Sequence, residues 1–117
     1  MSLAEIYANC GWDFAKISGN MLPENVIIGL IKEACELFDG YFKMIRNHVL
    51  SGEYSEARDI TNDILSTSNF LGLTSISAKV CDLKEAITDI LDKEHVMASY
   101  ESAYSQYELM CSFIKKL

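Results

Sequence analysis

The stretch ARDITNDILSTSNFLGL, residues 57–73, decides the fold of this chain. Placed on an α-helix, its apolar and small residues recur three or four positions apart and predict one buried stripe, made of Ala57, Ile60, Thr61, Ile64, Ser68 and Leu71. Asn62 falls two residues from Ile60 and two from Ile64, so we expect it to point into water. The same exposed side is expected to carry Arg58, Asp59, Leu65, Ser66 and Asn69. The stretch therefore predicts an amphipathic helix with a polar surface that one leucine interrupts.

The order of residue types in this stretch resembles the histidine-containing phosphotransfer (HPt) domain, whose signature reads approximately H-x-L-K-G-S-A-x-x-L-G. Residues 62–72 fall under that signature, anchored by Ile64 and by the pair Leu71 and Gly72. In the family, the leading histidine accepts a phosphoryl group from an aspartate of a receiver domain and passes it on. Here Asn62 holds that position, Leu65 stands where the family has lysine, and Ser66 replaces its glycine. The resemblance implies that the packing half of the motif is kept and its chemistry is lost.

Asn62 is not expected to accept a phosphoryl group. The lone pair of its amide nitrogen is delocalised into the carbonyl, whereas an imidazole nitrogen has a free lone pair. Asp59 and Asp63 lie within one helical turn of Asn62. A like-charge contact at ~4 Å costs about 1 kcal/mol in water and roughly 4 kcal/mol at the effective dielectric of a protein surface. We therefore expect no enzymatic phosphotransfer, no catalytic residue, no cofactor and no metal site.

Composition favours a single helical domain over residues 1–117. Half of the 117 residues are hydrophobic, and the chain holds one proline and six glycines, which favours long helices over strands. The net charge of −7 and the scattered basic residues argue against nucleic acid as a partner. The N-terminal residues lack a signal-peptide pattern, and the longest apolar run, residues 26–31, is too short to cross a bilayer. We expect a cytoplasmic protein that does not contact membranes.

The cysteines do not follow a disulfide or zinc pattern. Cys10, Cys35, Cys81 and Cys111 lie far apart, with no C-x-x-C pair and no histidine at zinc-ligand spacing. We expect all four to be reduced thiols in or near the core, as is usual in a cytoplasmic protein.

Apolar periodicity predicts an all-α fold: an antiparallel up-down four-helix bundle with a short additional N-terminal helix. Helices are expected over residues 23–51, 53–71, 74–92 and 95–117, with Thr74 or Ser75 as a cap and residues 92–94 as a charged turn. Residues 1–20 are expected to form a lid over one end of the core, through Trp12, Phe14 and Ile17. Inward positions are predicted on every long helix. Residues 23–51 are expected to bury Ile27, Leu30, Ile31, Ala34, Phe38, Tyr41, Phe42, Ile45 and Val49. Residues 74–92 are expected to bury Ile76, Val80, Leu83, Ile87 and Ile90 or Leu91, and residues 95–117 are expected to bury Tyr100, Ala103, Tyr107, Met110 and Ile114.

The resemblance implies a binding module of bacterial two-component phosphorelay signalling, which docks a receiver domain or a histidine kinase without carrying phosphate. The predicted contact surface consists of Arg58, Asp59, Asn62, Leu65, Ser66 and Asn69. Leu65 beside Phe70 or Leu73 would give that surface an apolar patch, and Arg58 would favour an acidic partner. The plain alternative for Asn62 is a solvated polar residue.

Two other functions stay open at this point. One is active phosphotransfer through His48 or His95, although neither histidine belongs to the helix that carries the motif. The other is an unrelated helical protein-interaction module, in which the likeness over residues 62–72 is chance.

Overall fold

Six helices and no strand make up the part of the chain that the structure describes, which confirms the all-α fold class. The computed structural model describes residues 2–19, 21–89 and 92–117. The helices are α1 (Leu3–Cys10), α2 (Phe14–Ser18), α3 (Glu24–Leu50), α4 (Tyr54–Leu71), α5 (Thr74–Thr88) and α6 (Lys93–Ile114).

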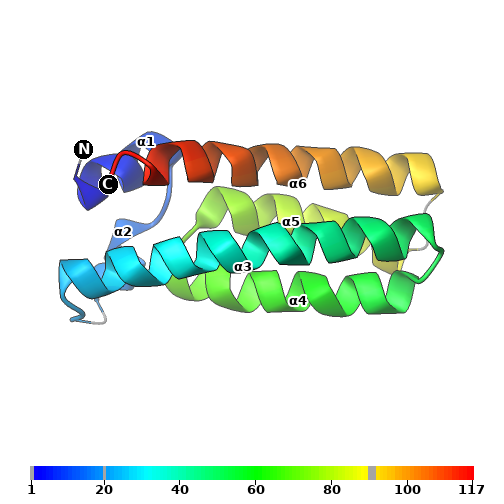
Figure 1. Ribbon diagram of the computed structural model, residues 1–117, viewed down its shortest axis with the longest axis horizontal. Helices are drawn as coiled ribbons and strands as arrows, with labels where there is room; N and C mark the ends of the chain where they lie inside the picture. The colour runs from blue at the N-terminus through cyan, green and yellow to red at the C-terminus, as the bar shows by residue number, and fades with distance from the viewer. Residues whose placement is uncertain (1, 20, 90–91) are drawn as a thin grey trace.

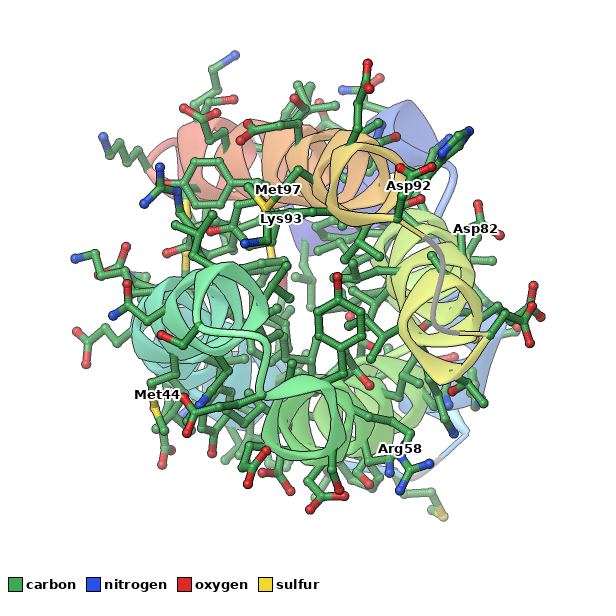
Figure 2. The ribbon with its side chains drawn as sticks, turned by 90° about the vertical axis from the view of Figure 1, so that its right-hand side faces the viewer. Met44, Arg58, Asp82, Asp92, Lys93 and Met97 are labelled. Atoms are coloured by element: carbon green, nitrogen blue, oxygen red, sulfur yellow. The ribbon has the colours of Figure 1, made fainter. Side chains whose placement is uncertain are left out.

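The four longer helices lie side by side along the long axis of the molecule, and neighbours in sequence run in opposite directions (Figure 1). Both α3 and α5 pack against α4 and against α6, so α4 and α6 are diagonal to each other. Figure 2 looks along the helices and shows side chains filling the space between the four ribbons. The short helices α1 and α2 lie at the end of the molecule that holds both termini (Figure 1).

Apolar residues at helical spacing fill the core, as the periodicity predicts. The predicted inward positions of α5 and α6 are buried: Ile76, Val80, Leu83 and Ile87, then Tyr100, Ala103, Tyr107, Met110 and Ile114. On α3 the buried positions are Ile27, Ile31, Ala34, Phe38, Phe42, Ile45 and Val49, while Leu30 and Tyr41 are half-buried. The predicted stripe position at Ile90 or Leu91 lies outside the described residues.

Two helix starts differ from the sequence prediction. Asp92 caps α6, because its carboxylate accepts a hydrogen bond from the His95 backbone N–H at 2.9 Å. Lys93 and Glu94 therefore belong to the first helical turn, and the predicted charged turn is wrong. At the start of α5, no side chain caps the helix, and the Thr74 hydroxyl instead donates to the Gly72 carbonyl.

The N-terminal segment is fastened to the connection between α4 and α5. The Trp12 indole N–H donates to the Ser75 hydroxyl at 2.8 Å, and the Asp13 backbone N–H donates to the Gly72 carbonyl at 2.9 Å. Trp12 and Ile17 are buried as a lid requires, whereas Phe14 is 36% exposed. The lid is thus built mainly from the two buried side chains, while the Phe14 ring makes a T-shaped contact with the Tyr7 ring.

Cysteine burial follows the prediction at three of four positions. All four thiols are free, and Cys10, Cys35 and Cys111 are half-buried. Cys81 is exposed, which contradicts its expected place in or near the core. It follows the buried Val80 by one position on α5, and adjacent positions on a helix point about 100° apart.

Changing Tyr7 to phenylalanine is expected to lower the free energy of unfolding by about 1–3 kcal/mol. The buried Tyr7 hydroxyl donates to the Leu71 carbonyl at 2.6 Å. Leu71 is the last residue of α4, so its carbonyl has no donor within the helix and would be left unpaired in a buried site. Urea denaturation of the two proteins measures the difference.

The matched control for that change is Tyr100→Phe. The Tyr100 hydroxyl also donates to a backbone carbonyl, that of Phe42 at 2.9 Å, but this acceptor lies inside α3 and keeps its helical donor. We expect the control to lose clearly less stability than Tyr7→Phe. Equal losses would show that the end of α4 is not held by Tyr7.

Candidate functional site

The exposed side of α4 is the surface on which the sequence motif falls. Four predicted residues are exposed there and define the α4 face: Asp59, Asn62, Ser66 and Asn69. Their spacing of three or four positions places them on one side of the helix. Asn62 points away from the buried stripe, as predicted. The exposed Asp63 is the next residue along the chain, so two carboxylates lie close to Asn62 in sequence and on the surface.

Hydrogen bonds of buried hydroxyl groups, as well as apolar packing, hold α4 in place under this face. The buried Thr61 hydroxyl donates to the Arg58 carbonyl at 2.6 Å. The buried Ser68 hydroxyl lies 2.8 Å from the Ser77 hydroxyl of α5. The contact between Ser68 and Ser77 joins α4 to α5, and both buried hydroxyl groups of α4 are hydrogen-bonded.

Leu65 does not belong to the exposed surface, so this part of the sequence prediction is wrong. Its side chain is only 8% exposed and belongs to the core. Leu65 follows Ile64 by one position, which turns it about 100° from the centre of the stripe. Because α4 packs against helices on both of its flanks, its buried surface is wider than a single stripe. Leu73 is also fully buried, so neither leucine supplies an exposed apolar patch.

Arg58 lies on the α5 side of α4 and is half-buried. It lines a surface depression of about 190 Å³ with Tyr54 and Ser55 of α4 and Ile87 and Thr88 of α5. Figure 2 shows its side chain reaching outward at that edge of the helix. The Arg58 guanidinium group therefore lies beside the α4 face and not at its centre.

An apolar groove that the sequence did not reveal borders the α4 face on the other side. This α3–α4 groove has a volume of about 200 Å³ and is lined by Leu30, Glu33, Ala34, Leu37, Thr67, Phe70 and Leu71. Leu37 is 45% exposed and Phe70 is 50% exposed. Phe70 lies one helical turn beyond Ser66, so the groove and the α4 face are continuous. The signal in the sequence was Leu37, an apolar residue outside the predicted stripe of α3.

The two histidines lie at helix ends, away from the α4 face. His48 is in the last turn of α3, and its Nδ1 lies 3.2 Å from the Glu53 carboxylate. His95 is in the first turn of α6, not in a turn between helices, and its Nδ1 lies 2.8 Å from Asp92. The hydrogen bond and charge of Asp92 raise the pKa of His95, which favours the imidazolium form over the neutral ring.

The α4 face offers amide, hydroxyl and carboxylate groups, which suit hydrogen bonding to a protein surface.

Within residues 2–19, 21–89 and 92–117, no group of three or more His, Cys, Asp or Glu side chains is arranged to hold a metal ion. In the same ranges, no helix has the length and hydrophobicity needed to cross a membrane. No protein-family model matches the chain, and comparison with curated proteins and with solved structures finds no match.

Proposed function

We propose that this chain is an HPt-like up-down four-helix bundle that docks a receiver domain of a bacterial two-component system without accepting phosphate. The cytoplasmic location belongs to the same proposal, because receiver domains act there. Docking would let the protein compete with phosphotransfer partners or hold a receiver in place. The residues assigned to the contact are the α4 face, Arg58 at its edge, and the α3–α4 groove.

This proposal rests on one feature of the surface. On one side of the molecule, the polar α4 face is continuous with the apolar α3–α4 groove. A specific protein contact needs apolar side chains to displace water and polar groups to fix orientation. The apolar side chains are those of Leu37 and Phe70. The polar groups are those of Asn62, Ser66 and Asn69. The antiparallel order of α3 to α6 supports the likeness to HPt domains, and Asn62 at the exposed motif position explains why docking is proposed without transfer.

Titration of isotope-labelled protein with receiver domains from the same organism tests the proposal by NMR. We expect amide shifts confined to the α4 face and to the residues of the α3–α4 groove. Incubation with a phosphorylated receiver is expected to leave this chain unphosphorylated. If no receiver perturbs the α4 signals at high micromolar concentration, docking is rejected. Transfer of an acid-labile phosphoryl group, lost when His48 or His95 is changed, would instead support active phosphotransfer.

Changing Ser66 to arginine is expected to weaken receiver binding about tenfold or more, because a long charged side chain would stand in the centre of the contact. Ser105→Arg is the matched control, since Ser105 is an exposed serine on α6, diagonal to α4. Isothermal titration calorimetry gives both dissociation constants. Equal weakening by the two variants would mean that charge alone, and not the α4 face, controls the interaction.

A further inference from the structure

Two cysteines meet at the junction of α3 and α6, on a different side of the molecule from the α4 face. Cys35 and Cys111 line the same open surface pocket of about 330 Å³, together with Lys32, Glu36, Ile114, Lys115 and Leu117. Both cysteines are half-buried. The pocket is open to solvent, and both cysteines contribute to its lining.

Tyr107 also links the parts of α3 and α6 that carry these two cysteines. Its hydroxyl donates to the Cys35 carbonyl at 2.9 Å, which ties this part of α6 to Cys35. Cys111 follows Tyr107 by one helical turn, so both residues occupy the same side of α6. The two helices therefore present Cys35 and Cys111 to each other across their contact.

A hydrogen bond with the Cys111 thiol contributes to the raised pKa of both Cys35 and Tyr107, which agrees with contact between these side chains. Burial raises the pKa of the Cys35 thiol to about 12, and a hydrogen bond with the Cys111 thiol acts in the same direction. Burial and a hydrogen bond with Cys111 likewise raise the pKa of Tyr107. Cys35 is protonated at neutral pH and reacts slowly there, because the thiolate is the reactive form.

We propose that Cys35 and Cys111 form a dithiol site that hydrogen peroxide closes to a disulfide between α3 and α6. One sulfur attacks a peroxide oxygen, so that an S–O bond forms, the O–O bond breaks and water leaves. The second sulfur then attacks the first, the S–S bond forms, and the S–O bond breaks as a second water leaves. Two electrons pass from the sulfurs to the peroxide, and both thiol protons end in water.

The cross-link is expected to stabilise the fold. It would join two helices that are separated in sequence by α4 and α5, and a disulfide that closes a long loop restricts the unfolded chain. We expect Tm to rise by about 10 °C on oxidation. Reduction with dithiothreitol should reverse the change.

Peptide mapping of the unchanged protein is the first test. The folded protein is treated with hydrogen peroxide in mildly alkaline buffer, remaining thiols are alkylated, and the digest is analysed by mass spectrometry. We expect a peptide pair joined through Cys35 and Cys111 as the main intramolecular cross-link. A mapping in which Cys35 is linked to Cys10 or Cys81 as often as to Cys111 overturns the proposal, and so does the absence of any cross-link.

Matched double variants give the second test. Cys10→Ser with Cys81→Ser keeps only the proposed pair and should lose both free thiols without forming dimers. Cys35→Ser with Cys111→Ser keeps the other two cysteines and should form no intramolecular disulfide. If the first variant retains two alkylatable thiols, or forms only dimers, the site does not exist. Both experiments are independent of receiver docking.

Discussion

Substituting Gly72 with alanine is expected to lower the free energy of unfolding by about 2–5 kcal/mol. Gly72 ends α4 in the left-handed region, with φ of 72°, where an L-residue costs about 1–2 kcal/mol. A Cβ atom at this position would also overlap the carbonyl oxygen of Asp13. Relieving that overlap would break the hydrogen bond from the Asp13 N–H to the Gly72 carbonyl and shift the N-terminal segment.

Gly11→Ala is the matched control for this change. Gly11 has a similar φ of 68°, but apart from Gly11 and its two chain neighbours, the structure places no atom within 4 Å of the Cβ that alanine would add. Replacing Gly11 with alanine should therefore lower the free energy of unfolding only by the cost of the left-handed backbone, about 1–2 kcal/mol. Urea denaturation of both variants separates the two contributions. Equal losses would show that the contact between Gly72 and Asp13 adds nothing to stability.

Replacing Phe42 with alanine is expected to cost about 3–5 kcal/mol, which is a large part of the ~5–15 kcal/mol typical of a folded domain. Phe42 is fully buried on α3. Its ring centroid lies 5.3 Å from that of Tyr107, 5.7 Å from that of Tyr104 and 6.0 Å from that of Tyr100. The substitution would leave a cavity beside three rings of α6. The hydroxyl groups of Tyr100 and Tyr107 donate to backbone carbonyls of α3, which limits how far these two rings can move.

Phe70→Ala serves as the control for the core substitution. Phe70 is half exposed, so its removal should change the free energy of unfolding by about 1 kcal/mol or less. Thermal and urea denaturation compare the two phenylalanines directly. The same Phe70 variant should weaken receiver docking while remaining folded, because its ring lines the α3–α4 groove. A loss of stability as large as that of Phe42→Ala would place Phe70 in the core and remove it from the proposed contact.

Much of the fold follows from the spacing of apolar residues. Helical periodicity correctly predicts the buried positions of α5 and α6, since a helix that covers a core must repeat its apolar side every three or four residues. Local capping chemistry accounts for Asp13 as the N-cap of α2 and for Gly72 as the left-handed end of α4. These features depend on residues close in sequence. The exposure of Asn62 is predicted for the same reason, because it lies opposite the stripe.

The candidate site was only partly predictable, and Leu65 and Phe70 show why. Both lie on the flanks of α4, where periodicity alone does not decide between core and solvent. Leu65 is covered, whereas Phe70 stays half exposed above the groove with α3. How closely each neighbouring helix approaches sets the width of the buried surface. The sequence therefore predicts the direction of the α4 face but not its borders.

The order of amino acids was enough to predict helices, their inward sides and the polar character around Asn62, because each depends on interactions within a few turns of one helix. Tertiary packing decided the burial of Leu65, the exposed pair Leu37 and Phe70, and the meeting of Cys35 with Cys111. Those features join residues of different helices. Their positions depend on how the helices pack together, which the periodicity of a single helix does not specify.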